Sequence, residues 1–547
     1  MSVKSAAWAA ALAVSLLAVA PSQAQTLDMS KVGQPPVGSW PTFNGDFSGR
    51  RFSTLTQINE KNVDTLRPAW IASFADVGPQ RGAPTPVIKG TPLMVDGVLY
   101  VTLPNYVYAM DARTGVRLWT YTWHDKGGHL VGNRGVGMWK NLIYFMGPDD
   151  WVICLDAKTG KEIWKKEIAN AREQYFTTSA PIVAKDHVLV GVGGDAMDIR
   201  GFLLSLDPQT GAEQWKFYTT PAAGEPGIET WPDVATSLRG GAGTWMPGSY
   251  DPELNTIYWG TGNANPVYAG QGRKGDNLYT ASIVALDVDT GKLKWHFQSM
   301  PHDTHDFDNT NMPVLFDATV DGKPRKLLSL AARSGWFVTL DRVTGKFLVS
   351  QPYIDDIKWV KGRNPVTGEP ISDRNDDPKV EGSISNNNPT NWFNPTYSET
   401  SRLFYVNSMR GMNIYYLLDT SPKPAGYSGT VAGLGESQRV LLAIDPLTGK
   451  RAWEHVYPNI HGAGSTIGPG LISTASNLLF TGDDQGNMIA YRATDGEILW
   501  HYKAPANQSN GPVTYMLDGK QWMLMAAGDS LYAFTLPDSQ VAGATPR

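Results

Sequence analysis

Two aspartates near the middle of the chain are spaced so that their carboxylates could act together. Asp306 and Asp308 end the run Pro-His-Asp-Thr-His-Asp-Phe-Asp, and in a locally extended segment residues i and i+2 face the same side. A carboxylate can take a proton from a substrate hydroxyl, and carboxylate oxygens suit a hard divalent cation. The pair could therefore serve as general base and metal ligand, although an aspartate in such a segment can also simply cap a turn.

A repeated phrase shows which elements must hold these residues. It reads apolar residues, Asp, two variable residues, Thr-Gly, three variable residues and Trp, and it predicts a hairpin because Asp caps the turn and Gly tolerates positive φ. Asp341–Gly345 has Val349 at the Trp position, Arg492–Gly496 with Trp500 lacks the Asp, and Trp70 lacks the turn. The full phrase occurs at Asp111–Gly115 with Trp119, Asp156–Gly160 with Trp164, Asp207–Gly211 with Trp215, Asp287–Gly291 with Trp295 and Asp445–Gly449 with Trp453.

The period of the repeat predicts the fold. Most turns follow one another after 45 to 54 residues, which is typical of a four-stranded propeller blade. Counting the Trp positions gives eight blades, so we expect an all-β, eight-bladed propeller in which each Trp docks on a neighbouring sheet. The strand Gln521–Ala526 is expected to complete a blade begun near the N-terminus. Intervals of 80 and 104 residues indicate insertions near 218–243 and 351–390, which we expect to cover the mouth of the ring.

Composition narrows the class of protein. The net charge is −5 without a basic block, which gives little support to a nucleic-acid or membrane-surface role. A single cysteine, Cys154, excludes an intrachain disulfide and a C-x-x-C-H haem attachment site. Residues 1–24 read as a secretory signal peptide, with Lys4, an apolar run and a small-x-small cleavage pattern; an uncleaved anchor is the alternative. We therefore expect residues 25–547 to form one propeller domain without a membrane span.

Local phrases along this repeat resemble the quinoprotein alcohol dehydrogenases, periplasmic eight-bladed propellers that use pyrroloquinoline quinone (PQQ). The resemblance covers nearly all of the chain after residue 24. It implies that Asp306 is the catalytic base and that Asn263 is a calcium ligand. The cofactor contacts that it implies are Arg134 in Asn-Arg-Gly-Val, Thr178 in Thr-Thr-Ser-Ala-Pro, Trp245 in Gly-Thr-Trp as the floor beneath the quinone, Arg333 in Ala-Ala-Arg-Ser-Gly and Asn391 in Asn-Trp.

These residue types also make chemical sense for a flat tricarboxylate. Guanidinium groups and hydroxyls bind carboxylates, and an indole offers a broad aromatic face. Taken singly, Arg134 and Arg333 fit surface ion pairs, Trp245 fits a core and Asn263 fits a turn. Their occurrence in the expected order favours the PQQ site.

The sequence departs from the family at several positions. Gly128-His129 stands where most alcohol-oxidising members have adjacent cysteines, and we expect the His129 imidazole to stack on the quinone; the alternative is that it points to solvent. Gly193-Gly194-Asp195-Ala196 replaces a stretch that supplies a Glu metal ligand. Gly193 and Gly194 are expected to line the cofactor, and Asp195 reaches the metal only if a bulge turns it inward. Gly468 replaces a late Trp, and Lys89 replaces an early Glu.

The resemblance implies a periplasmic enzyme that oxidises an alcohol by hydride transfer to metal-activated PQQ. The expected metal set is Asn263, Asp306, Asp308 and Asp195, with calcium preferred and a lanthanide as the alternative, since an acid at position 308 accompanies lanthanide use in some members. Electrons would pass to an external acceptor such as cytochrome c, and a homodimer is left open. The competing hypothesis is a non-catalytic periplasmic propeller scaffold for protein assembly.

Overall fold

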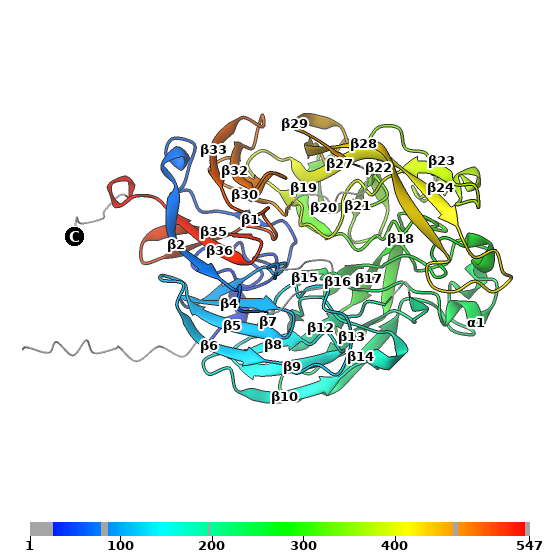
Figure 1. The fold of residues 1–547 in the computed structure, drawn as a ribbon, viewed down its shortest axis with the longest axis horizontal. Coiled ribbons are helices and arrows are strands. Elements are labelled where there is room, and N and C mark those ends of the chain that lie inside the picture. Colours follow the sequence, from blue (N-terminus) through cyan, green and yellow to red (C-terminus); the bar gives the residue numbers. More distant parts are fainter. Residues whose placement is uncertain (1–25, 78–85, 195–196, 463–468, 542–547) are drawn as a thin grey trace, which may run out of the picture.

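The computed structural model describes residues 26–77, 86–194, 197–462 and 469–541. These residues form eight sheets of four or five strands and one two-stranded sheet, with only short helices. The sheets follow one another around a ring, so that the chain runs once around it from blue to red (Figure 1). The all-β prediction is thus confirmed.

The strands of five successive sheets are β3–β6 (Leu93–Val95, Val98–Leu103, Tyr106–Asp111, Arg117–Thr122), β7–β10 (Gly137–Trp139, Leu142–Met146, Trp151–Asp156, Glu162–Glu167), β11–β14 (Ile182–Ala184, His187–Gly191, Phe202–Leu206, Glu213–Tyr218), β15–β18 (Ser249–Asp251, Thr256–Gly260, Ser282–Asp287, Leu293–Gln298) and β19–β22 (Val314–Val320, Lys323–Ala331, Trp336–Asp341, Phe347–Pro352). The remaining sheets are β25–β29 (Ser383–Asn386, Thr396–Tyr397, Phe404–Leu417, Gly429–Ile444, Arg451–Gly462), β1 with β30–β33 (Phe52–Ser53, Ile472–Thr474, Leu478–Gly482, Asn487–Arg492, Ile498–Lys503), β2 with β34–β36 (Arg67–Ser73, Val513–Leu517, Lys520–Ala527, Ser530–Thr535) and the two-stranded β23–β24 (Val360–Arg363, Pro370–Ser372).

The indoles of the repeat join each sheet to the next. Six of the seven rings lie on the turn glycine of the following sheet, Trp500 being the exception, and the Nε1–H of each donates to a backbone carbonyl at 2.8–3.3 Å. At the position without an indole, Val349 and Gln351 lie against Gly449. The indoles and their acceptor residues are Trp70 and Ala112, Trp119 and Ala157, Trp164 and Pro208, Trp215 and Val288, Trp295 and Arg342, Trp453 and Ala493, and Trp500 and Leu66.

The turn glycines under these indoles predict a measurable loss of stability on substitution. Gly160 has φ +69°, and a Cβ there would lie 2.6 Å from the Trp119 ring. A left-handed backbone costs an alanine about 1–2 kcal/mol, and overpacking adds about 1–3 kcal/mol. Gly322→Ala is the matched control, because Gly322 has φ +72° and nothing within 4 Å of the added Cβ.

We therefore expect Gly160→Ala to lower the free energy of unfolding by about 1–3 kcal/mol more than Gly322→Ala does. Urea denaturation of both variants and the parent protein measures this difference. Equal losses in the two variants would show that the indole contact contributes nothing.

The two ends of the chain meet in one sheet. Strand β2 pairs antiparallel with β36, with Arg67 opposite Thr535, and β36 pairs with β35. The blue β2 accordingly lies beside the red β35 and β36 (Figure 1). This confirms that the strand predicted at Gln521–Ala526 shares a sheet with an N-terminal strand. Apolar side chains fill the spaces between neighbouring sheets and form the core.

Both predicted insertions are ordered in the described part of the chain. The first holds two short helices, η5 (Ile228–Thr230) and α1 (Val234–Ser237). The second holds β23–β24, η7 (Arg374–Asp376) and β25, which pairs with β27. The remaining short helices are η1 (Met29–Lys31), η2 (Val63–Thr65), η3 (Ala171–Glu173), η6 (Gly270–Arg273) and η8 (Asp538–Gln540).

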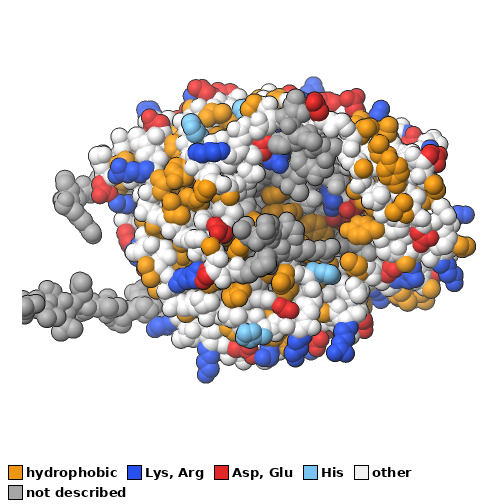
Figure 2. Space-filling view, in the orientation of Figure 1, with side chains coloured by type: hydrophobic (Ala, Val, Ile, Leu, Met, Phe, Trp, Pro, Cys, Tyr) orange, Lys and Arg blue, Asp and Glu red, His pale blue; other side chains and the backbone are white. Residues whose placement is uncertain are grey.

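The space-filling view shows a face hollowed near its centre, with charges of both signs spread over the rim (Figure 2). Among the described residues, no helix has the length and apolar character needed to cross a bilayer. The predicted signal peptide, residues 1–24, lies outside the described residues.

Candidate functional site

One arginine holds both predicted aspartates. Arg333, just after β20, donates from Nη1 to Asp308 Oδ2 at 2.7 Å and from Nη2 to Asp306 Oδ2 at 3.3 Å. The second oxygen of Asp308 accepts the backbone N–H of Asn263, just after β16, at 2.7 Å. Loops from two sheets therefore converge on the segment between β18 and β19. The two aspartates share one arginine although Asp306 has φ +61°, so the segment is not the extended one that the sequence analysis assumed.

The backbone around Asp306 is fixed by a second acid. The fully buried Asp303 accepts the N–H groups of His305 and Phe307, each at 2.8 Å, so that it closes the turn that carries Asp306. Asp306 itself has φ +61°, a left-handed conformation that Asp and Asn tolerate better than most residues. The loop thus presents one particular side chain toward Arg333.

The second insertion supports the same loop. His305 Nε2 lies 3.2 Å from Asp376 Oδ2, and the Thr304 hydroxyl donates to Asp377 at 3.0 Å. Both acids come from the end of η7 or directly after it. Sequence reasoning expected this insertion to cover the mouth; its described contacts show that it buttresses the Asp306 loop.

Burial and charge oppose each other at Asp306. Burial raises the pKa of Asp306 above its ordinary value, the positive charge of Arg333 lowers it, and Asp308 and Asp303 raise it again. At Arg333 burial works against the charged form, but Asp306 and Asp308 outweigh it and raise the Arg333 pKa. The guanidinium is therefore a fixed positive charge beside a carboxylate that binds a proton more readily than usual.

A second cluster surrounds Arg134. This side chain is 4% exposed, and its Nη1 donates to the Thr178 hydroxyl and, at 3.1 Å, to the Thr178 carbonyl. Its guanidinium carbon lies 4.9 Å from the centre of the Trp245 ring and 5.2 Å from that of Trp392. Burial lowers the pKa of Arg134 to about 9, and its Nε has no partner among the described residues. A buried cation without a carboxylate is a ready binding site for an anion.

A chain of hydrogen bonds joins the two clusters. Trp392 donates its backbone N–H to Asn391 Oδ1 at 2.8 Å, and the Asn391 backbone carbonyl accepts from Asn311 Nδ2 at 2.7 Å. Asn311 Oδ1 in turn accepts the backbone N–H of Arg333 at 3.1 Å. On the other side, Asn263 accepts the N–H of Ala242, three residues before Trp245. The structure thus brings most of the residues that sequence reasoning selected to one end of the ring.

The predicted metal ligands are only partly described. Asn263, Asp306 and Asp308 lie together, while Asp195 lies outside the described residues. No group of three or more His, Cys, Asp or Glu suited to a metal ion occurs within the described ranges. The neighbouring Asn265 and Asn309 are buried, and neither amide has a partner for its side-chain oxygen or nitrogen among those residues. The described site therefore supplies two carboxylates and an amide, rather than three or more acidic ligands.

His129 and Gly193 both contact Phe176, two residues before Thr178. The His129 ring lies edge-on to Phe176, with ring centres 5.1 Å apart. Phe176 also accepts the backbone N–H of Gly193 at 2.8 Å, and a Cβ on Gly193 would lie 2.8 Å from its ring. Gly194 has φ +106°, which explains a glycine there. Ala196 and Gly468 lie outside the described residues.

Sequence reasoning missed two residues that shape the site. The sequence analysis assigned no role to Trp392, yet its ring contacts the Arg134 guanidinium. The sequence analysis assigned no role to Asp303, although its carboxylate accepts two backbone N–H groups of the Asp306 loop. The aromatic pair Trp392-Phe393 was a usable signal for the first residue; spacing alone offered none for the second.

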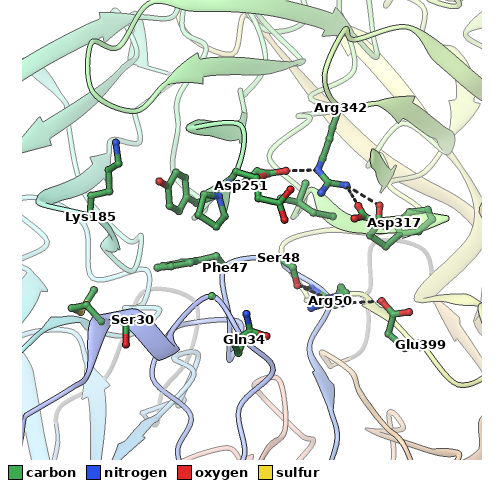
Figure 3. Close-up of a pocket in the computed structure, with 17 residues that line it drawn as sticks. Ser30, Gln34, Phe47, Ser48, Arg50, Lys185, Asp251, Asp317, Arg342 and Glu399 are labelled. Atoms are coloured by element: carbon green, nitrogen blue, oxygen red, sulfur yellow. Dashed lines mark hydrogen bonds and ion pairs between the residues drawn. The ribbon is translucent and has the colours of Figure 1, made fainter. Parts of the chain in front are cut away.

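A cavity of about 630 Å³ lies away from these residues (Figure 3). It opens near the β15–β16 turn, at the other end of the strands from Trp245. Its arginines are already paired: Arg342 contacts Asp251 at 2.7 Å and Asp317 at 2.6 Å, and Arg50 contacts Glu399 at 2.8 Å. None of the predicted site residues lines it.

Comparison with known proteins identifies the family. The model of the PQQ glucose/ethanol/alcohol dehydrogenase β-propeller domain matches residues 40–354 and 441–523. The chain is 35% identical over 517 residues to the quinoprotein alcohol dehydrogenase PedH of Pseudomonas putida, covering 88% of this chain and 84% of that protein. It is also 35% identical to a quinohemoprotein alcohol dehydrogenase of Comamonas testosteroni, covering 89% of this chain and 72% of that protein. The chain belongs to the PQQ-dependent dehydrogenase family.

Solved structures agree with this assignment. The crystal structure of the Comamonas testosteroni quinohemoprotein alcohol dehydrogenase superposes with a TM-score of 0.84 at 30% identity, covering 96% of this chain and 84% of that one. A europium-containing methanol dehydrogenase gives a TM-score of 0.81 at 28% identity, covering 93% of this chain and 100% of that one. The resemblance stated from the sequence is confirmed, and the all-β fold is that of a β-propeller.

Proposed function

We propose that this chain oxidises an alcohol to an aldehyde or ketone with PQQ bound at the Arg134 site and a metal ion at the Asp308 site. The observation that carries the proposal is the buried Arg134, whose guanidinium contacts two indoles and has no carboxylate partner among the described residues. We also propose that residues 25–547 form one domain whose eight sheets are the blades of a closed ring. The hydrogen bond from Trp500 to Leu66 supports closure.

The residues at the Arg134 site fit PQQ. A flat tricarboxylate needs fixed cations, hydroxyl donors and an aromatic surface, and Arg134, Thr178 and Trp245 supply these. Arg333 and Asn391 would bind its other edge, and Gly193 and Gly194 would line it. The glycine at 193 lets the Phe176 ring pack against the backbone, since a Cβ there would lie 2.8 Å from that ring. When bound, PQQ supplies the quinone carbonyl that accepts the hydride equivalent.

The metal would be held by Asn263, Asp306 and Asp308, with Asp195 as a further candidate. Asn263 fits because its Nδ2 donates to Ala264, which leaves the amide oxygen for a cation. Calcium is the proposed metal, because the described set holds only two carboxylates and the family's Glu position is Ala196; a lanthanide is the alternative. The ion would act as a Lewis acid on the quinone.

Asp306 would take the hydroxyl proton of the alcohol. Its Oδ2 is held by Arg333, which leaves Oδ1 to accept, and its side chain is 20% exposed and so within reach of a substrate. As the proton passes to Asp306 and the hydride leaves the carbinol carbon, the alcohol becomes a carbonyl compound. Arg333 would hold the carboxylate in place and stabilise negative charge nearby.

The released electrons would go to a separate acceptor, for which we propose a cytochrome c in the periplasm. Cys154 is the one cysteine of the sequence and is buried, so a C-x-x-C-H haem attachment site does not occur in this chain. The signal-like residues 1–24 support the periplasmic location.

Reconstitution tests the proposal. The purified protein, incubated with PQQ and calcium and then passed over a sizing column, should carry a quinone absorbance band with it. The same sample should reduce an artificial electron acceptor when a series of alcohols and polyols is supplied. Protein that never retains PQQ would overturn the cofactor assignment. Retention of PQQ without oxidation of any alcohol would favour the scaffold hypothesis instead.

His129 makes a separate prediction about cofactor affinity. An imidazole stacked on the quinone contributes about 0.5–1.5 kcal/mol, so His129→Ala should raise the PQQ dissociation constant several-fold. His129→Phe keeps a flat ring and should largely preserve affinity. Fluorescence titration of the metal-loaded apoprotein measures both. Unchanged affinity in His129→Ala would show that the ring does not stack on the quinone.

A further inference from the structure

A second cation lies next to the Arg134 cluster. Lys89 is half-buried, and its Nζ donates to the Val131 carbonyl at 2.5 Å. The segment that follows it runs beside Arg134, because Thr91 donates its backbone N–H to the Arg134 carbonyl at 3.0 Å. Lys89 and Arg134 therefore occupy adjacent backbone segments at the same end of the ring.

Neither cation is neutralised within the described part of the chain. No carboxylate there forms an ion pair with Lys89 or Arg134, whereas Arg333 has two. Burial and, after it, the positive charge of Arg134 together lower the pKa of Lys89 to about 8. Two neighbouring like charges in a partly desolvated place disfavour one another unless an anion joins them.

The Lys89 side chain packs closely against the backbone at Gly132. Gly132 has φ +156°, and a Cβ there would lie 2.7 Å from Lys89 Cδ. The glycine thus lets the lysine stem pass close to the 131–134 backbone. An ammonium has three donors, and the Val131 carbonyl uses one of them.

We propose that Lys89 is a second carboxylate-binding residue of the cofactor site, which together with Arg134 holds the anionic edge of a bound polycarboxylate. This inference rests on the proposed PQQ function and adds a contact to it. In the family that the chain resembles, a Glu is expected at this position. A glutamate carboxylate repels the carboxylates of a tricarboxylate, whereas a lysine ammonium attracts them. This chain would therefore bind the anionic edge through different contacts from such relatives.

The test compares PQQ affinities, measured by fluorescence quenching or calorimetry on metal-loaded apoprotein, so that turnover is not needed. Lys89→Gln removes the charge but keeps a polar side chain of similar reach, and it should raise the dissociation constant about 10-fold to 100-fold. Lys89→Arg keeps the charge and should restore most of the affinity. Lys158→Gln, in the exposed β9–β10 turn, is the matched control and should bind like the parent protein.

The pH dependence separates a charge effect from a packing effect. Among the described residues, Arg134 is the charged group that acts on Lys89, and the imidazole of His129 lies two residues before Val131 in the sequence; both are unchanged in the variant. The ratio of the Lys89→Gln and parent dissociation constants should therefore shrink as the pH rises above the Lys89 pKa of about 8, because the parent loses its own charge there.

The outcomes are distinct. If the parent protein fails to bind PQQ, the proposed function is wrong. If the parent binds and Lys89→Gln binds equally well, or if its loss of affinity is the same at every pH, then the lysine does not bind the cofactor's carboxylates.

Discussion

Asp306→Asn is expected to abolish turnover while the protein still binds PQQ. The substitution removes the proton acceptor and keeps the size of the side chain, and loss of a general base typically lowers the rate about 100-fold to 10,000-fold. Asparagine also tolerates the left-handed backbone at φ +61°, so the loop should keep its shape. The measurement is kcat with a saturating alcohol and a saturating artificial acceptor.

Asp321→Asn provides the matched control. Asp321 has φ +50° in an exposed turn between β19 and β20, so it undergoes the same chemical change in a similar backbone. Its kcat should equal that of the parent. A near-parental rate in Asp306→Asn would remove Asp306 from the role of base, and loss of PQQ binding in that variant would instead assign it to cofactor retention.

Removal of the metal should have an effect of similar size. A Lewis acid contributes several kcal/mol to the stabilisation of developing charge, so exhaustive chelation should lower the rate more than about 100-fold. Arg333, which holds Asp306 and Asp308 at 3.3 and 2.7 Å, would then remain as the positive charge beside the two carboxylates. Adding calcium back should restore the rate.

Cofactor content must be followed in the same samples, because loss of PQQ would mimic loss of the metal. Circular dichroism before and after chelation checks that the fold survives. Stronger recovery with lanthanum than with calcium would overturn the preference for calcium and leave the site in place. Full activity after prolonged chelation would refute the metal assignment.

The fold could be predicted closely because its signals are local and repeated. The Asp-x-x-Thr-Gly turn and the Trp that follows occur at nearly constant spacing, and a Trp such as Trp119 needs only the next turn, at Gly160, as its partner. The weak copies were also informative, since Trp70 and Val349 dock where the phrase predicts. The PQQ family followed from short phrases around Arg134, Asp306 and Arg333.

The geometry of the candidate site was less predictable because it depends on contacts between distant segments. Asp308 contacts Arg333 and the backbone N–H of Asn263, which are separated from it by 25 and 45 residues in the sequence. Trp392 reaches Arg134 across more than 250 positions, and no spacing rule in one sequence encodes that. The insertion around Asp376 could be located, but its contact with His305 could not.

The pairing of β2 with β36 has a consequence for how the chain folds. Arg67 can pair with Thr535 only after almost the whole polypeptide has been made, because nearly the full length of the chain separates the two residues. Contacts of that kind form slowly, and until they form β2 and β36 keep unpaired edges that can aggregate. Sheets in the middle of the chain can assemble from local hairpins during synthesis. The pairing of β2 with β36 must follow completion of the C-terminal strand, and shortening the chain before Ser530 would leave β2 without its partner strand.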